Sequence, residues 1–320
     1  MTNVLVTGAS GFVGRALCPA LERAGYTVIG SSRTAQSLAG ISEVRQIRDL
    51  TDMDSVRPAM AEIDIVIHLA ARAHIMDDKS ADPLEAYRQI NVDGTRTLAE
   101  AASAAGVKRF VFLSSIKVNG EQTFEKPYSA GDIPAPEDAY GISKAEAEQC
   151  LNHTAGRSDL EIAIIRTPLV YGPGVRANFL SLMSLANSSL PLPFGAITNN
   201  RRSLIYIENL VSILLASAEN SAANGQIFLV RDGEDLSTTD LLRQLRRALN
   251  RPERLIAFPP SLLRAMLTVL GKGNIANRLL GSLAINDQAT KELMNWTPPF
   301  SVSEGLKHTA DWYLSNKDSC

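Results

Sequence analysis

The sequence predicts an α/β protein with a doubly wound parallel sheet, whose two faces are both covered by helices. Short β-branched runs alternate with longer helical patterns through the first half of the chain. This alternation is typical of parallel strands joined by crossover helices. The chain has 320 residues, 45% of them hydrophobic and 21% charged, which is enough to bury a substantial core.

The predicted elements follow one another in the order that such a sheet requires. Strands are predicted at 3–8, 26–31, 43–50, 63–71, 108–115, 160–168 and 225–230. Helices are predicted from about 12 to 24, at 86–106, at 137–149 and at 209–220. Beyond position 170 prolines and glycines become frequent, which predicts a smaller, irregular part. We therefore expect a Rossmann-type core at 1–170, completed by 204–231, and an interleaved substrate-binding cap at 171–203 and 232–320.

Composition and charge narrow the class of partner. The formal net charge is −2, so the chain has no basic field that would recruit nucleic acid. The amino terminus lacks a cleavable apolar segment, and 209–218 is too short to span a bilayer. These features predict a cytoplasmic protein that acts on small molecules, without membrane insertion. Three distant cysteines and four scattered histidines show no metal-ligand spacing, so no metal is expected.

A glycine-rich turn joins the first predicted strand to the first helix. Gly8, Gly11 and Gly14 stand in "TGASGFVG", with the spacing GxxGxxG rather than GxGxxG. Backbone amides and the positive end of the helix meet at such a turn and bind a pyrophosphate. The turn therefore predicts a dinucleotide site, to which its residues Ser10, Phe12 and Val13 also belong.

The end of the second strand bears on the choice of dinucleotide. A site specific for NAD usually has a carboxylate there, whereas this sequence has Ser31, Ser32 and Arg33. A hydroxyl beside a guanidinium suits a 2′-phosphate, so NADP(H) is favoured and NAD(H) stays open. Asp49, at the end of the third strand, either accepts a hydrogen bond from the adenine amine or stabilises a loop.

Tyr140 and Lys144 share one face of the helix predicted at 137–149, because residues four apart on a helix are neighbours. An ammonium near the phenol, together with an oxidised nicotinamide, lowers the pKa of the tyrosine from about 10 towards neutrality. Such a tyrosine is a usable acid or base. Ser115 ends a strand about 25 residues upstream, where its hydroxyl can hydrogen-bond a substrate carbonyl beside the tyrosine.

These elements, in this order and spacing, resemble the extended short-chain dehydrogenase/reductases, especially the nucleotide-sugar epimerase and dehydratase branch. The resemblance covers nearly the whole chain. Its signatures are "TGASGFVG", "HLAA", "NVDGT", "SSIKVNG", "YGISK", "RTPLVYGPG" and "RRSLIYIENL". It implies a catalytic triad of Ser115, Tyr140 and Lys144 that is supported structurally by Asn91. It also implies cofactor contacts from Asn91, Tyr140, Lys144, Ser32, Leu50, Leu69, Ala70 and Ala71.

The same resemblance implies a substrate site for a nucleotide sugar, with UDP as the expected nucleotide. Arg202 would contact the diphosphate, and the segment around Asn178 and Phe179 would line the nucleotide. The family's "RxGD"-like loop is replaced here by "NRLLGSLAINDQATKELMNW", in which Arg278 is the candidate for the second phosphate contact. Lys117 either pairs with a substrate phosphate or acetamido carbonyl, or reaches solvent.

Ile116 and Lys117 narrow the reaction. The 4,6-dehydratases have an aspartate and a glutamate at these positions, and an aliphatic chain cannot transfer a proton. Hydride transfer at C4 remains. Since Arg33 favours NADPH, we expect a 4-ketoreductase of bacterial O-antigen biosynthesis that acts on a UDP-4-keto-6-deoxy-N-acetylhexosamine. The alternatives are a UDP-hexose or UDP-N-acetylhexosamine 4-epimerase with retained NAD, and a non-catalytic NADP-binding regulator.

Two further expectations concern surfaces. Many relatives pair through a four-helix interface built from two long core helices, so the resemblance implies a homodimer. The segment 261–283, "SLLRAMLTVLGKGNIANRLLGSL", is amphipathic and is expected to form a cap helix, with covering the substrate or contacting a partner as alternatives.

Overall fold

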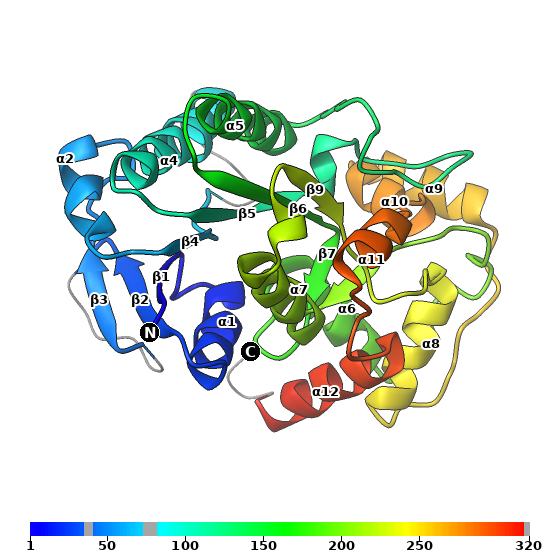
Figure 1. Cartoon of the computed structure of the whole chain (residues 1–320). Coiled ribbons are helices and arrows are strands. Elements are labelled where there is room, and N and C mark those ends of the chain that lie inside the picture. Colours follow the sequence, from blue (N-terminus) through cyan, green and yellow to red (C-terminus); the bar gives the residue numbers. More distant parts are fainter. Residues whose placement is uncertain (35–40, 73–81, 317–320) are drawn as a thin grey trace.

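The centre of the molecule is a seven-stranded parallel sheet, as the sequence predicts. The computed structural model describes residues 1–34, 41–72 and 82–316. The strand order is β3-β2-β1-β4-β5-β6-β9 (Figure 1). The strands are β1 (Asn3–Thr7), β2 (Thr27–Ser32), β3 (Glu43–Gln46), β4 (Ile65–His68), β5 (Arg109–Ser115), β6 (Glu161–Thr167) and β9 (Gln226–Leu229).

Both faces of this sheet are covered by helices, which is why its central strands are almost continuously apolar. Figure 1 shows α4 and α5 on one side of the sheet and α1 and α7 on the other. These helices are α1 (Phe12–Arg23), α4 (Gly94–Ala104), α5 (Ala139–Ala155) and α7 (Ile207–Glu219). The layer of α1 and α7 encloses one apolar cluster with Val4 and Val6, and that of α4 and α5 encloses another with Leu5.

The long helix predicted at 86–106 is interrupted by a wider turn. It consists of α3 (Pro83–Arg88), a π-helical turn (Gln89–Asp93) and α4. π-Turns of this kind are rare and are often found at functional sites. Shorter helical pieces are α2 (Met53–Val56) and the 3₁₀ segments Arg57–Met60, Ile116–Val118 and Ser221–Ala223.

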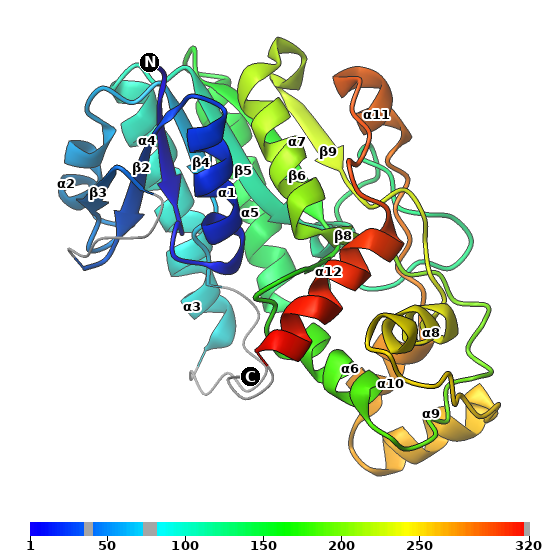
Figure 2. The ribbon, with the colours of Figure 1, turned by 90° about the horizontal axis from the view of Figure 1, so that it is seen from below.

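The rest of the chain forms a second layer with its own apolar cluster (Figure 2). It contains a parallel pair, β7 (Leu169–Tyr171) and β8 (Leu204–Tyr206), and the helices α6 (Ala177–Asn187), α8 (Thr238–Ala248), α9 (Pro260–Val269), α10 (Gly273–Leu280), α11 (Gln288–Met294) and α12 (Val302–Ser315). The single cap helix expected over 261–283 is wrong. The chain breaks between α9 and α10 at Gly271, whose φ of 70° favours glycine.

Asp232 joins the second layer to the sheet. Its carboxylate accepts hydrogen bonds from the Tyr206 backbone N–H at 2.8 Å, the Asn209 amide at 2.8 Å and the Tyr171 hydroxyl at 2.7 Å. Burial raises the pKa of Asp232 to about 6, against the effect of these donors. No helix within the described ranges is long and apolar enough to cross a membrane. The role of 171–203 and 232–320 as a substrate-binding cap stays a prediction.

Candidate active site

The turn between β1 and α1 requires its glycines. Gly8 has a φ of 69°, and a Cβ built on it would lie 2.8 Å from the Ala70 nitrogen. A Cβ on Gly14 would lie 2.4 Å from the Gly8 carbonyl oxygen, so the helix packs directly on the turn. Gly11 precedes α1, whose first turn receives no side-chain cap from the described residues. The backbone N–H groups there suit the pyrophosphate of a dinucleotide.

The other predicted residues of this turn frame it. Ser10 is exposed, and its carbonyl accepts a hydrogen bond from the Arg15 guanidinium at 2.9 Å. Phe12 and Val13 begin the helix and pack against the apolar cluster of the second layer. A Cβ built on Gly174 would lie 3.8 Å from the Phe12 ring, so the loop after β7 approaches the turn.

His68 fixes the end of β4 beside this turn. Its Nδ1 lies 2.6 Å from the Thr7 hydroxyl, and its Nε2 lies 3.0 Å from the Thr95 hydroxyl. The Thr7 hydroxyl also accepts from the Ala70 backbone N–H at 3.2 Å, which holds the predicted cofactor segment of Leu69, Ala70 and Ala71 against β1. Burial, together with the charge of Lys144, lowers the pKa of His68 to about 3, so the ring is neutral. A structural role is therefore supported for this histidine.

The end of β2 presents the residues that bear on the choice of dinucleotide. Arg33 is exposed, and its backbone carbonyl accepts from the Gln46 amide at 3.0 Å. Its neighbour Ser32 accepts from the Thr34 N–H at 3.4 Å. One oxygen of Asp49 accepts from the backbone and hydroxyl of Thr51 at 2.9 and 2.8 Å, which favours the loop role. A Cβ built on Gly94 would lie 3.0 Å from the Cβ of Leu50, so Leu50 packs closely against the start of α4.

Ser115 and Tyr140 meet at the carboxyl end of the sheet. The serine is the last residue of β5, and the tyrosine lies in the first turn of α5. The Ser115 hydroxyl lies near the phenol, and its interaction with the phenol favours the ionised form. Burial first, and then the charge of Asp138, raise the pKa of Tyr140 to about 12. The phenol therefore stays protonated at neutral pH in the chain itself.

Lys144 lies one turn further along α5 and is only 1% exposed. Its Nζ sits 3.8 Å from the centre of the Phe112 ring, a cation–π contact. Burial lowers the pKa of Lys144 to about 7, although Glu148 opposes the shift. An ammonium in this position suits the ribose hydroxyls of a dinucleotide.

The sequence-based expectation that Lys144 lowers the pKa of Tyr140 does not hold in the chain itself. The shift of Tyr140 is upward and is caused by burial and Asp138. The physical reason is that burial disfavours the charge on both groups, so the lysine carries less of the charge that would stabilise a phenolate.

Asn91 lies in the π-turn and connects three segments. Its oxygen accepts from the Arg72 backbone N–H at 2.8 Å, and its amide donates to the Arg72 carbonyl at 3.1 Å and the Ser143 hydroxyl at 2.9 Å. Ser143 in turn donates to the Tyr140 carbonyl at 2.8 Å. The π-turn thus holds the chain after β4 against the helix of Tyr140 and Lys144.

Lys117 is held by two carboxylates. Its Nζ lies 2.6 Å from Glu121 and 2.5 Å from Asp138. Asp138 is also the N-cap of α5, because its other oxygen accepts from the Gly141 N–H at 2.7 Å. The proposed pairing of Lys117 with substrate is therefore not supported, since its charge is already neutralised within the protein.

The predicted diphosphate residues come together from distant parts of the chain. Arg278 on α10 donates to the Asn178 side chain on α6 at 3.4 Å, and Arg202 donates to the Gly281 carbonyl at 3.3 Å. Burial and the like charge of Arg278 lower the pKa of Arg202 to about 10. Two neighbouring guanidinium groups suit a diphosphate. The Phe179 side chain is 1% exposed and stacks on Tyr171, so it belongs to the core, and the lining of the nucleotide by its segment stays a prediction.

Sequence reasoning missed the acidic residues around the site. Glu148 on α5 pairs with Arg166 on β6 at 2.6 Å, and both are almost fully buried. Ser114 donates to Glu148 at 2.5 Å, so this network fixes α5 to the end of β5. A signal for Asp138 was present, because an aspartate directly before a predicted helix is a typical N-cap. Nothing in the local pattern indicates the pairing of Glu148 with Arg166.

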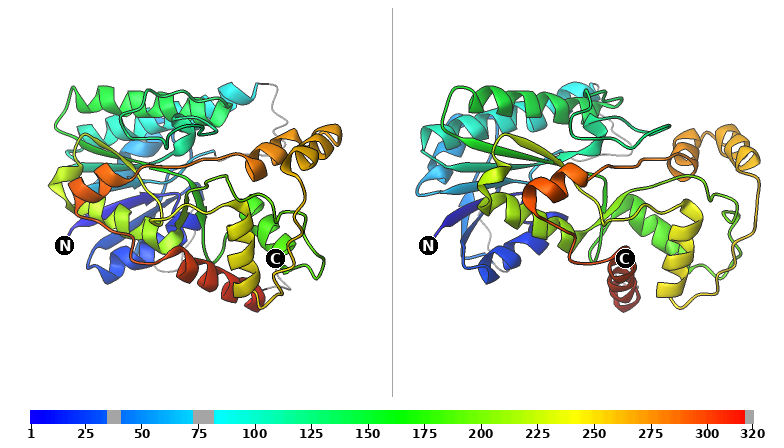
Figure 3. Two further views of the ribbon diagram at one scale, coloured as in Figure 1. Left: turned by 90° about the vertical axis from the view of Figure 1, so that its right-hand side faces the viewer. Right: turned by 45° about the vertical axis from the view of Figure 1, so that its right-hand side comes forward.

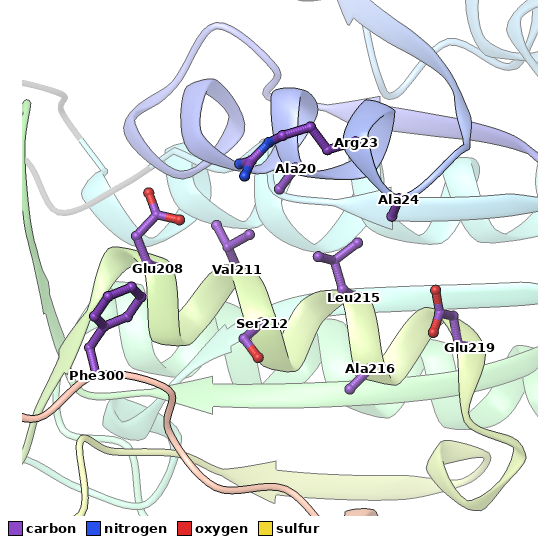
Figure 4. A pocket seen from close by; sticks show the side chains of 10 residues that line it. All are labelled: Ala20, Arg23, Ala24, Glu208, Val211, Ser212, Leu215, Ala216, Glu219 and Phe300. Carbon is purple, nitrogen blue, oxygen red and sulfur yellow. The ribbon is translucent and has the colours of Figure 1, made fainter.

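A hollow of about 430 Å³ lies elsewhere, between α1 and α7 (Figure 4). Figure 4 shows Val211 and Leu215 between the helices, with Arg23 and Glu208 near its rim. It is formed by the outer sides of helices, whereas ligands of parallel sheets bind beyond the carboxyl ends of the strands. None of the predicted site residues lines it. The described residues also contain no group of three or more metal-binding side chains.

Comparison with known proteins assigns the fold and the motifs to one family. The sequence profile described as "NAD dependent epimerase/dehydratase family" matches residues 4–230. A UDP-glucose 4-epimerase from Vibrio cholerae is 44% identical over 98% of this chain and 95% of its own. An N-acetyl-alpha-D-glucosaminyl-diphospho-ditrans,octacis-undecaprenol 4-epimerase from Escherichia coli O157:H7 is 29% identical over 97% and 95%. The UDP-glucose 4-epimerase of Thermotoga maritima, solved with UDP-glucose, matches with a TM-score of 0.79 at 23% identity, covering 99% and 100%.

Proposed function

The chain belongs to the NAD-dependent epimerase/dehydratase family, and we propose that it is a 4-epimerase of a UDP-linked hexose or N-acetylhexosamine that retains its NAD. The observation that carries the chemistry is the meeting of Ser115, at the end of β5, with Tyr140, one helical turn from the buried Lys144. The 44% identity to a UDP-glucose 4-epimerase supports epimerisation over net reduction.

In this proposal the residues of the chain handle one proton at the C4 oxygen. NAD would supply the acceptor and donor of the C4 hydride. Tyr140 takes the proton of the C4 hydroxyl as the sugar is oxidised and returns it as the sugar is reduced. Ser115 hydrogen-bonds the same oxygen in both steps. Lys144 would hold the ribose of the cofactor, one helical turn from the phenol.

The residues fit both the cofactor and the diphosphate of such a substrate. The first turn of α1 offers its backbone N–H groups to the cofactor pyrophosphate. Arg202 and Arg278 offer two guanidinium groups to the sugar diphosphate, and Ile116 at the dehydratase acid position argues against loss of water. A homodimer that pairs through two long core helices stays a prediction.

A specific observation favours a second candidate. Arg33 is exposed at the end of β2, where the sequence has no carboxylate, and this favours NADPH over NAD. A net 4-ketoreductase of a UDP-4-keto-6-deoxy-N-acetylhexosamine would use that cofactor, as the sequence analysis expects. The third alternative, a regulator without turnover, is disfavoured because the triad is complete.

The experiment is to incubate the purified protein with UDP-glucose or UDP-N-acetylglucosamine without added cofactor, and to identify the sugars by NMR. The C4 epimer should form with the wild type and not with Tyr140→Phe. In a parallel reaction, a UDP-4-keto-6-deoxy-N-acetylhexosamine is mixed with NADPH. Stoichiometric loss of NADPH there, with no epimer in the first reaction, would replace the epimerase by the ketoreductase.

A further inference from the structure

The α9–α10 hairpin, residues 260–280, carries an unusual concentration of exposed apolar side chains. Among the described residues thirteen large apolar side chains are exposed, and five of them lie on the hairpin. They are Leu262, Met266, Val269, Leu270 and Ile275, and Ile256 lies shortly before it. Figure 3 shows this hairpin projecting from the rest of the molecule. The face is therefore available to something outside the chain.

On α9 these side chains follow helical spacing. Leu262, Met266 and Val269 are separated by four and three residues, so they share one side of the helix, and their exposed fractions are 54%, 54% and 87%. Leu263 and Leu267 pack inward on the apolar cluster of the second layer. The apolar arc of α9 is thus wider than the part that the protein itself covers.

The charged residues within this stretch are all cations, and the acidic residues that bound it, Glu253 and Asp287, pair with Arg247 and with Arg231 and Lys291. The sequence from 254 to 286 contains Arg254, Arg264, Lys272 and Arg278 and no aspartate or glutamate, although the whole chain has a net charge of −2. Arg264 is exposed and donates to Asn277 at 2.9 Å across the hairpin, and Lys272 is exposed in the turn. An apolar face whose own charged residues are all cations is complementary to a surface that is apolar within and anionic at its boundary.

We propose that the α9–α10 hairpin docks on the surface of an anionic lipid bilayer, with the exposed side of α9 at the boundary between headgroups and acyl chains. The contact is peripheral, because both helices are far too short to span a bilayer. A second copy of the chain is a poorer occupant. In a two-fold symmetric contact the same cations would oppose one another, with no acidic residue in the segment to pair with them.

Docking would bring the diphosphate-binding side of the site close to the membrane. Ile275 and Arg278 are three residues apart on α10, about one helical turn. Arg278 lies beside Arg202, whose pKa it lowers. The inference does not depend on the proposed reaction, since the exposed side chains of the hairpin are separate from Ser115, Tyr140 and Lys144.

The test is flotation of the full-length protein with phosphatidylcholine vesicles that contain or lack phosphatidylglycerol. We expect binding only to the anionic vesicles and weaker binding at high salt. Val269→Asp should weaken binding on the order of tenfold or more, and so should Lys272→Glu, which reverses a charge near the surface. Leu293→Asp on α11 and Lys307→Glu on α12 are matched controls, because both positions are exposed and both helices lie away from the hairpin (Figures 2 and 3).

Several outcomes would overturn the proposal. One is the absence of wild-type binding to anionic vesicles, and another is equal loss in the control variants. If Val269→Asp changes the oligomeric state while the wild type does not float, the face belongs to a second copy. If Val269→Asp unfolds, as judged by circular dichroism, Lys272→Glu decides the question. Epimerisation measured in the same preparations separates loss of docking from failure of the proposed reaction.

Discussion

The Lys117 ammonium lies 2.5 Å from the carboxylate of Asp138, the residue that caps the helix of Tyr140. Asp138 is also the largest charge effect on the pKa of that tyrosine. The lysine therefore neutralises the carboxylate that most opposes formation of a phenolate. We therefore expect Lys117 to influence Tyr140 through Asp138 rather than to act on the substrate.

Replacing Lys117 by methionine should leave the Asp138 charge unneutralised and raise the pKa of Tyr140 further. The ascending limb of the profile of kcat/KM against pH should move to higher pH by up to about one unit. Lys117→Arg should restore the profile. An unshifted profile with a raised KM would instead indicate contact with the substrate.

Asp138→Asn should have the opposite effect. The amide keeps an N-cap acceptor for α5, so the helix should persist, while the negative charge beside Tyr140 is lost. We expect the pH limb to move to lower values and the melting temperature to change little. A limb that moves upward, or does not move, would show that Asp138 does not control the phenol.

Lys144→Met should separate activity from stability. Loss of the ammonium should reduce kcat on the order of 10²-fold or more. The pKa of Lys144 is about 7 in the folded chain and about 10.4 when unfolded, so the unfolded chain binds more protons between these values. The free energy of unfolding of the wild type should therefore rise with pH through this window, and the variant should lack this rise. Urea unfolding at pH 7 and pH 9 measures this change in the free energy of unfolding. An equal change between the two pH values in the wild type and the variant would contradict the prediction.

His68 should make the fold sensitive to acid. Its pKa is about 3 when folded and about 6.5 when unfolded, so the unfolded chain binds the extra proton between these values. The stability attributable to this residue is present above pH 6.5 and falls as the pH falls, by on the order of 3 kcal/mol at pH 4. His68→Gln should lose less stability between pH 7 and pH 4 than the wild type. His308→Gln is the control, because His308 is exposed. An equal loss of stability between pH 7 and pH 4 in the wild type and both variants would refute the role of His68.

Local sequence patterns were sufficient to predict the sheet and the meeting of Ser115 with Tyr140. The apolar runs of β1, β4, β5 and β6 identify buried parallel strands, and Gly8 and Gly14 identify a turn that tolerates no side chain. Ser115 and Tyr140 meet because one ends a strand and the other begins the next helix, an order that the sequence displays directly.

Other features could not be predicted, because they depend on contacts between segments that are distant in the sequence. Lys117 meets Asp138 only because the chain between them folds back, and the pairing of Glu148 with Arg166 requires the packing of α5 on β6. The direction of the Tyr140 pKa shift depends on burial, which the spacing of tyrosine and lysine does not encode. The burial of the Phe179 side chain could not be predicted for the same reason, since only the tertiary structure shows that it stacks on Tyr171.

The most direct measurement uses UDP-glucose that carries deuterium at C4, incubated with the purified protein and no added cofactor. If Tyr140 serves a retained NAD in both directions, the C4 epimer should form and keep its deuterium at C4, and Tyr140→Phe should form none. Formation of the epimer with loss of the deuterium would contradict return of the same hydride. Absence of the epimer, together with stoichiometric oxidation of NADPH by a 4-keto sugar, would contradict epimerisation itself.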